Sequence, residues 1–185
     1  PGEILQIWKG GLASHGGAIG ILVGMWLYCR KYKFDFLWVL DRLVIVVCFT
    51  AACIRTGNLM NSEIIGKITD LPWGFEFIQA YPRTLGADPR HPAQLYEAIY
   101  SLILMFILFA LWKKNHGKLK KGFLSGVFLI VLFCMRFITE NFKINQEAFE
   151  NSLVLNMGQI LSIPFIIAGI ILVVKSQKSK VAPNQ

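Results

Sequence analysis

Long uncharged apolar runs dominate this sequence and limit the folds open to it. A helix needs roughly 20 mostly apolar residues to cross a bilayer. Five segments come close to that requirement: Leu12–Cys29, Phe36–Ile54, Pro92–Trp112, Gly122–Ile138 and Leu153–Val174. The runs are continuous and do not alternate, which argues against a β-barrel. We therefore predict an all-α fold, a polytopic transmembrane helical bundle with about five spans.

The composition supports a chain that is covered by lipid. Charged residues make up only 16% of the 185 residues, and hydrophobic residues make up 55%. Soluble domains carry about 25% charged residues, so this chain has too few to cover its surface with solvated side chains. The four cysteines lie in or beside the apolar runs without metal-ligand spacing, and we expect no metal site: Cys29, Cys48, Cys53 and Cys134.

The net charge of +8 is arranged in three basic blocks and not spread along the chain. The blocks are Arg30 to Lys33, Lys113 to Lys121 and Lys175 to Lys180. Each block lies at the end of a predicted span, and all three fall on one side if the five spans alternate. This is the positive-inside pattern of membrane proteins. It predicts a cytoplasmic C-terminus and no nucleic-acid partner.

The chain contains no linker or repeat, and we predict a single transmembrane domain over residues 1–185. Residues 57–91 form the longest region without a span and should lie on the outer side. Their prolines and aromatic residues favour an ordered extramembrane cap. The sequence starts at Pro1, and an N-terminus outside the membrane needs an upstream segment to deliver it. We expect further membrane helices before residue 1.

Polar residues gather at the outer ends of several predicted spans. They are His15, Arg55, Asn58, Glu63, Glu97, Arg136 and Glu140. Taken singly, an interfacial histidine or a local ion pair would explain them. Ionisable residues at membrane depth are costly, however, and four spans converge on one level. We therefore predict a shared site at the outer leaflet, where two arginines suit an anionic lipid headgroup. Asp41 and Arg42 lie near the inner end, where they favour helix positioning over chemistry.

Five ordered motifs resemble those of prolipoprotein diacylglyceryl transferases. The run Arg55-Thr-Gly-Asn58-Leu-Met-Asn61-Ser-Glu63-Ile-Ile-Gly66 resembles the family signature G-R-x-G/A-N-F-x-N-x-E-x-x-G, with Ile54 and Leu59 as departures. The other four motifs are His15-Gly16-Gly17, His91-Pro92-Ala93-Gln94-Leu95-Tyr96-Glu97, Arg136-Phe137-Ile138-Thr139-Glu140 and Met157-Gly158-Gln159. Where the family often has an arginine followed by Pro-Asp, this chain has Lys143 and then Asn145-Gln146.

The resemblance implies an activity, its partners and a location. Such enzymes move a diacylglyceryl group from phosphatidylglycerol to the lipobox cysteine thiol in the signal peptide of a bacterial prolipoprotein. A thioether forms and glycerol phosphate leaves. No cofactor is implied. The reaction would take place among membrane lipids at the outer leaflet of the bacterial cytoplasmic (inner) membrane, with the C-terminus in the cytoplasm.

The same resemblance suggests roles for individual residues. Arg55 and Arg136 would hold the phosphodiester, and Glu140 would orient Arg136. His15 is the candidate base for the thiol, because imidazole removes protons at neutral pH, and Glu63 is its rival. The expected substrate-binding residues are Arg55, Asn58, Asn61, Gly66, His91, Gln94, Tyr96, Glu97 and Arg136.

A transporter or lipid flippase is the alternative function. The polar residues of such a protein should recur at several depths along a path. Here they crowd at one level, apart from Asp41 and Arg42. An intramembrane protease is a third possibility, but no serine–histidine pair is evident.

Overall fold

The computed structural model describes residues 14–80, 87–115, 119–144 and 155–178, and these contain helices but no strand. The elements are α1 (Ser14–Tyr32), α2 (Phe36–Met60), α3 (Ala93–Lys114), α4 (Phe123–Thr139), the short 3₁₀ helix η4 (Glu140–Phe142) and α5 (Met157–Lys178). Among the described residues, four helices are long and apolar enough to cross a membrane: α2, α3, α4 with η4, and α5. The predicted polytopic helical fold is therefore confirmed.

The first helix, α1, is not one of these four. It forms over the first predicted span, but glycines and two terminal basic residues dilute its apolar run. It belongs to a compact unit of residues 1–39, separate from the unit that begins at Leu40. Within the first unit the rings of Tyr28 and Phe34 stack at 6.0 Å, and those of Phe34 and Trp38 stack at 6.2 Å. The described residues thus support four of the five expected spans by length and composition.

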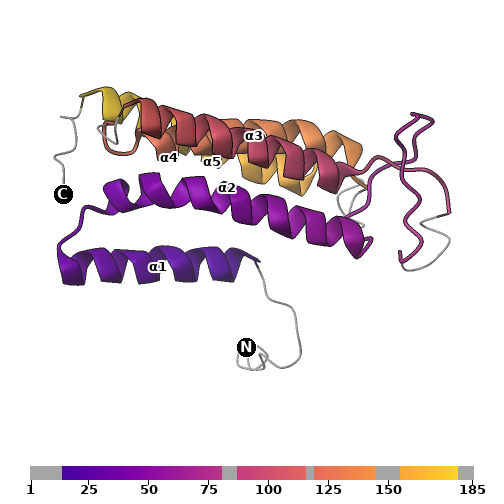
Figure 1. The fold of residues 1–185 in the computed structure, drawn as a ribbon, viewed down its shortest axis with the longest axis horizontal. Helices are drawn as coiled ribbons and strands as arrows, with labels where there is room; N and C mark the ends of the chain where they lie inside the picture. Colours follow the sequence, from indigo (N-terminus) through magenta and orange to yellow (C-terminus); the bar gives the residue numbers. More distant parts are fainter. Residues whose placement is uncertain (1–13, 81–86, 116–118, 145–154, 179–185) are drawn as a thin grey trace. The chain divides into compact units, whose positions relative to one another are not determined.

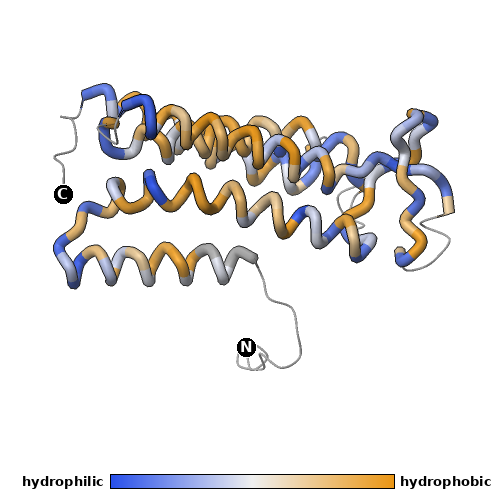
Figure 2. The backbone as a smooth tube through the Cα atoms, in the orientation of Figure 1, coloured by the Kyte–Doolittle hydropathy of each residue, from blue (hydrophilic) through white to orange (hydrophobic). Residues whose placement is uncertain are grey.

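The second unit is an antiparallel bundle of α2, α3, α4 and α5 (Figure 1). Its core is built by Val44 and Cys48 of α2, Leu104 and Leu108 of α3, and Leu124 and Phe128 of α4. Only 22–28% of each candidate span is buried, many apolar side chains of α2, α3 and α5 are exposed, and Figure 2 shows the hydrophobic residues running along the helices. Lipid-facing helices need such an outer surface.

Two glycines allow α4 and α5 to approach closely. A Cβ atom on Gly126 would lie 2.7 Å from Val173 Cγ2 and 2.9 Å from the carbonyl oxygen of Gly169. A Cβ atom on Gly169 would lie 2.9 Å from the carbonyl oxygen of Gly126. Small residues bring membrane helices together in this way, because dispersion contacts and not water exclusion hold them. The contact joins the start of α4 to the C-terminal half of α5.

Asp41 connects α2 to the start of α4. Its carboxylate accepts hydrogen bonds from the Gly122 N–H at 2.7 Å, the Ser125 N–H at 2.8 Å and the Ser125 hydroxyl at 2.6 Å. The first N–H groups of a helix have no partner within the helix, and a carboxylate also complements the helix dipole there. A carboxylate of one span therefore caps another span, which fits the positioning role predicted for this residue.

We expect Asp41→Ala to destabilise the bundle without touching the polar end. Loss of an N-cap costs about 1–2 kcal/mol, and here two buried N–H groups also lose their acceptor. Thermal unfolding of the full-length gene product in detergent would measure this as a lowered Tm. Asp70→Ala removes an exposed carboxylate and is the control. Equal Tm values for the two variants would contradict the capping role.

The connection between α2 and α3 is ordered by a few backbone pairs and a small core. Arg90 forms isolated antiparallel bridges with both Ile68 and Phe75. Ile65, Phe77 and Ala80 are buried together. Residues 81–86 of the predicted cap lie outside the described residues. The connection lies at the end of the bundle where α2 ends and α3 begins (Figure 1).

Candidate active site

The antiparallel order of the helices brings four helix ends to one place. These are the C-terminal ends of α2 and α4 and the N-terminal ends of α3 and α5 (Figure 1). Each end carries one or more of the polar motifs. A chain of ion pairs joins the ends of α2 and α4 to the start of α3.

Four charged side chains form this ion-pair chain. Arg55 Nε of α2 lies 2.6 Å from Glu97 Oε2 of α3. The other oxygen of Glu97 lies 2.8 Å from Lys143 Nζ, which in turn lies 3.0 Å from Glu140 Oε2 of η4. The side chains of Glu97 and Lys143 are only 2% and 5% exposed. Charges this buried are stable only when paired, so each member holds its neighbours in place.

Lys143 is the site residue that sequence reasoning missed. Its position was noted only as one where the family often has arginine. The structure buries it between two carboxylates, and its backbone forms an isolated bridge with Gly66. The available signal was its spacing: three residues after Glu140 places it over that residue once the chain turns as a 3₁₀ helix.

Arg55 keeps donors that the ion pair does not use. Its Nε binds Glu97, and its Nη1 donates to Asn58 Oδ1 at 3.4 Å. Asn58 Nδ2 donates in turn to Glu63 Oε2 at 2.7 Å. A guanidinium has five N–H groups in a planar fork, and the bonds to described residues use only Nε and Nη1, so Nη2 is the group placed to bind an incoming anion.

The turn that carries Glu63 is held by Gln94. This fully buried side chain of α3 donates from Nε2 to the Glu63 carbonyl oxygen. The Glu63 N–H donates to the Asn58 carbonyl oxygen at 2.9 Å. Next to it, Ile64 adopts φ 56°, a left-handed conformation that disfavours a β-branched residue. Such strain costs about 1–3 kcal/mol and persists where the surrounding contacts fix the backbone.

His91 and Tyr96 belong to an aromatic cluster beside the ion-pair chain. The hydroxyl of Tyr96 lies 3.2 Å from His91 Nδ1 and accepts a hydrogen bond from Trp73 Nε1 at 3.0 Å. The His91 ring also packs on Phe142 at 5.0 Å. These contacts join the α2–α3 connection to the start of α3 and to η4.

Gly66 acts through its lack of a side chain. A Cβ atom there would collide with the carbonyl oxygens of His91 and Phe142. The chain passes between the start of α3 and η4 at this point, and the bridge from Gly66 to Lys143 sets the position of that lysine. The close packing is a structural reason for glycine at this position, and the predicted contact of Gly66 with a substrate stays a prediction.

The expected pairing of Glu140 with Arg136 is not found. No ion pair joins these two described residues, and Glu140 binds Lys143 instead. Arg136 is half-buried. Its charge is close enough to interact electrostatically with the Tyr100 hydroxyl of α3, as are the charges of Arg55 and Glu97. The Glu140 N–H still donates to the Arg136 carbonyl oxygen as in a helix, but the Glu140 carboxylate binds Lys143, which the bridge to Gly66 places next to it.

Two further predicted residues have simpler placements. Asn61 is exposed in the turn after α2. His15 lies in α1, in the first unit, and its side chain lies outside the described residues. In the described part of the chain no three His, Cys, Asp or Glu side chains gather in a metal-binding arrangement.

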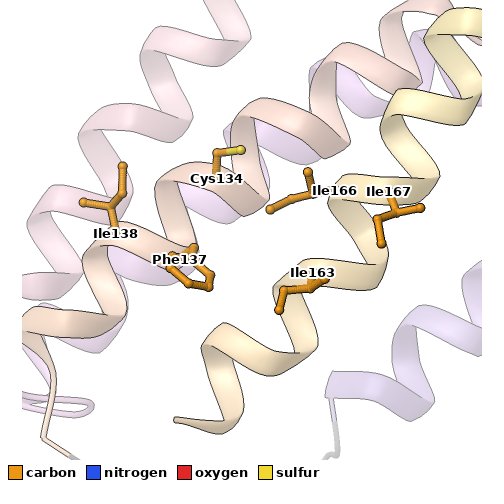
Figure 3. Close-up of a pocket in the computed structure, with 6 residues that line it drawn as sticks. All are labelled: Cys134, Phe137, Ile138, Ile163, Ile166 and Ile167. Atoms are coloured by element: carbon orange, nitrogen blue, oxygen red, sulfur yellow. The ribbon is translucent and has the colours of Figure 1, made fainter. Parts of the chain in front are cut away.

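An apolar groove of about 370 Å³ lies between α4 and α5. Figure 3 shows the side chains that line it: Cys134, Phe137 and Ile138 of α4, and Ile163, Ile166 and Ile167 of α5. None of these residues carries a charge, so the groove can accommodate hydrocarbon but cannot supply acid, base or anion-binding groups.

The fold and the site together define a polytopic helical membrane protein with a buried, charge-paired polar site at one end of its bundle. Comparison with known proteins makes the assignment specific. The sequence model of the prolipoprotein diacylglyceryl transferase family matches residues 1–175, and the chain belongs to this family.

Curated relatives are named phosphatidylglycerol–prolipoprotein diacylglyceryl transferase. One from Bacteroides fragilis is 51% identical over 160 residues, covering 86% of this chain and 56% of its own length. Another from Tolumonas auensis is 46% identical over 181 residues, covering 97% of this chain and 68% of its own length. A third from Porphyromonas gingivalis is 46% identical over 191 residues, with 98% and 68% covered. The chain thus spans little more than half the length of the Bacteroides relative.

Proposed function

We propose that the full-length gene product transfers the diacylglyceryl group of phosphatidylglycerol to the lipobox cysteine of a prolipoprotein. The observation that carries this proposal is the buried ion-pair chain from Arg55 through Glu97 and Lys143 to Glu140. It fixes one cation with spare donors at the end of a membrane bundle. Family membership and the names of the relatives supply the substrate classes. A transporter or flippase is not favoured.

The proposed reaction is a displacement at carbon. The sulfur of the deprotonated lipobox cysteine attacks the glyceryl carbon that carries the phosphate. The carbon–oxygen bond breaks, its electron pair stays on the phosphate oxygen, and glycerol phosphate leaves. A base must first take the thiol proton, and His15 and Glu63 remain the two candidates for this step.

Arg55 and Arg136 would stabilise the leaving phosphate. Glu97 holds Arg55 by its Nε atom, so the guanidinium plane is fixed before the lipid arrives. Donors that are preorganised in a site with little water stabilise developing charge without reorganisation at the moment of reaction. Asn58 and Asn61 would orient headgroup oxygens. Gln94, His91 and Tyr96 would keep the surrounding turn and helix start in place.

We propose that the site faces the outer leaflet of the bacterial cytoplasmic membrane and that residues 57–91 form a cap outside it. The basic blocks around Lys113 and Lys175 support this orientation, because they lie at the opposite end of the bundle from the ion-pair chain. There Lys120 Nζ donates to the Gln177 carbonyl oxygen at 2.6 Å. Basic loops favour the cytoplasmic side, which leaves the polar site outside and the C-terminus inside.

A transfer assay with phosphatidylglycerol radiolabelled in an acyl chain tests the proposal. Full-length wild-type protein should transfer the label to a lipobox peptide. Arg55→Lys should lose at least about tenfold in kcat/KM, roughly 1.4 kcal/mol, because an ammonium cannot bind Glu97 and phosphate with one planar fork. Arg30→Lys, in a basic block, is the control and should keep wild-type activity. Equal transfer by both variants would remove Arg55 from the reaction.

A further inference from the structure

The motif Met157-Gly158-Gln159 at the start of α5 has no role in the reaction described above. Its local structure is a capping box built on Asn156. The Gln159 N–H donates to Asn156 Oδ1 at 2.9 Å, and the Asn156 N–H donates to Gln159 Oε1 at 3.2 Å. The two side chains thus accept reciprocally from N–H groups at the helix start, and the Gln159 N–H also donates to the Asn156 carbonyl oxygen at 3.0 Å. An amide oxygen on each side chain is enough for this, so both NH₂ groups are spare.

The spare NH₂ groups bind the end of α4. Asn156 Nδ2 donates to the Glu140 carbonyl oxygen at 3.3 Å. Gln159 Nε2 donates to the Phe137 carbonyl oxygen at 3.3 Å and to Asn141 Oδ1 at 3.2 Å. The last carbonyl groups of a helix have no partner within the helix. One pair of amides therefore caps the start of α5 and the end of α4 together.

Gly158 brings the carboxylate of Glu140 onto this junction. A Cβ atom at Gly158 would collide with the Glu140 carboxyl group, so that group lies directly against the first turn of α5. The N-terminal turn of a helix favours negative charge. Two contacts therefore hold Glu140. Its backbone carbonyl oxygen accepts a hydrogen bond from Asn156, and its carboxylate lies against Gly158.

We propose that Asn156 and Gln159 are positioning residues for Glu140, and through it for Lys143 and the rest of the ion-pair chain. This inference rests on the proposed transferase function for its catalytic consequence. Glu140 is the terminal member of the chain, and Lys143 is held between it and Glu97. If the end of α4 moves away from α5, Glu140 moves with it and Lys143 loses one of its two carboxylates.

The variant Asn156→Ser separates positioning from helix capping. Serine is as good an N-cap residue as asparagine, because its hydroxyl oxygen can accept from the Gln159 N–H. It cannot also donate to the Glu140 carbonyl oxygen, so only the link to α4 is lost. The matched control is Asn115→Ser, since Asn115 Nδ2 donates to the Leu111 carbonyl oxygen at 2.8 Å at the other end of the bundle.

The experiment uses full-length protein in lipid nanodiscs containing phosphatidylglycerol, with three readouts. The first two are the kinetics of transfer to a lipobox peptide and the Tm. The third is the rate at which an amine-reactive reagent modifies the Lys143 side chain, measured by mass spectrometry. For Asn156→Ser we expect kcat to fall about tenfold with little change in KM or Tm. Modification of Lys143 should become several-fold faster than in the wild type. Asn115→Ser should change neither rate.

Wild-type kcat and wild-type protection of Lys143 in Asn156→Ser would overturn the inference and leave an ordinary helix cap. Faster modification with unchanged kcat would also overturn it, because the displaced ion pair would then have no catalytic effect. If Asn156→Ser does not fold, Gln159→Glu takes its place, since it keeps the acceptor for Asn156 and removes the donors to α4. If the wild type transfers nothing, the proposed function fails, and the protection of Lys143 still tests the positioning.

Discussion

Glu97→Gln should abolish transfer more completely than any other single substitution in the site. Glu97 is the only residue of the ion-pair chain that binds two cations, Arg55 at 2.6 Å and Lys143 at 2.8 Å. Glutamine keeps the shape but removes the charge, so Arg55 loses its carboxylate partner and the buried Lys143 keeps only Glu140. Breaking buried pairs costs about 3–5 kcal/mol, and we expect kcat/KM to fall at least about 100-fold.

The measurement is kcat/KM for the lipobox peptide together with the Tm of the full-length protein. Glu76→Gln, an exposed carboxylate of the α2–α3 connection, is the matched control and should stay close to the wild type in both. Near-normal turnover by Glu97→Gln would show that the ion-pair chain is not needed for the reaction.

Gly66→Ala should have the second largest effect. The added methyl group would meet two backbone carbonyl oxygens, those of His91 and Phe142, and neither can turn aside as a side chain could. Overpacking against fixed atoms costs about 1–3 kcal/mol. The chain at Gly66 must then separate from η4, which takes Lys143 away from Glu97. We expect activity to fall at least about tenfold, with a lowered Tm.

Gly57→Ala is the control for this substitution. Gly57 lies within α2, and a Cβ atom there would meet nothing within 4 Å. Alanine is a better helix former than glycine, so the Tm should stay equal or rise slightly. If Gly66→Ala behaves like Gly57→Ala in the transfer assay, the close packing around residue 66 does not set the geometry of the site.

The fold class could be predicted from the sequence because lipid imposes simple rules. A span must be long, apolar and hydrogen-bonded within itself, so apolar run lengths identify helices directly. Antiparallel alternation then brings the ends that carry Arg55 and Glu97 together without any knowledge of packing. α1 shows where this reasoning weakens, since its glycines and terminal charges leave it helical but less apolar than the other four helices.

The pairing within the site could not be predicted in the same way. Arg136 and Glu140 are four residues apart, a spacing that places two side chains on one face of a helix but does not decide which partner each one binds. Glu140 keeps the helical hydrogen bond to the Arg136 carbonyl oxygen, yet its carboxylate binds Lys143, which is held in place by the bridge to Gly66. His91, Gln94 and Glu97 are each three residues apart, a spacing that would place them on one face of a continuous helix. Since α3 begins at Ala93, His91 lies before the helix and its ring contacts Tyr96 and Phe142.

The most direct test follows the oxygen atom that joins the diacylglyceryl group to phosphate. Phosphatidylglycerol labelled with ¹⁸O at this position is incubated with full-length protein and a lipobox peptide. The masses of both products are then measured by mass spectrometry. Attack of sulfur on carbon predicts a peptide that gains an unlabelled diacylglyceryl group through a thioether. All of the label should be in the released glycerol phosphate. A modified peptide that carries ¹⁸O would contradict the account. Release of glycerol phosphate by the wild-type protein while the lipobox cysteine stays unmodified would contradict it as well.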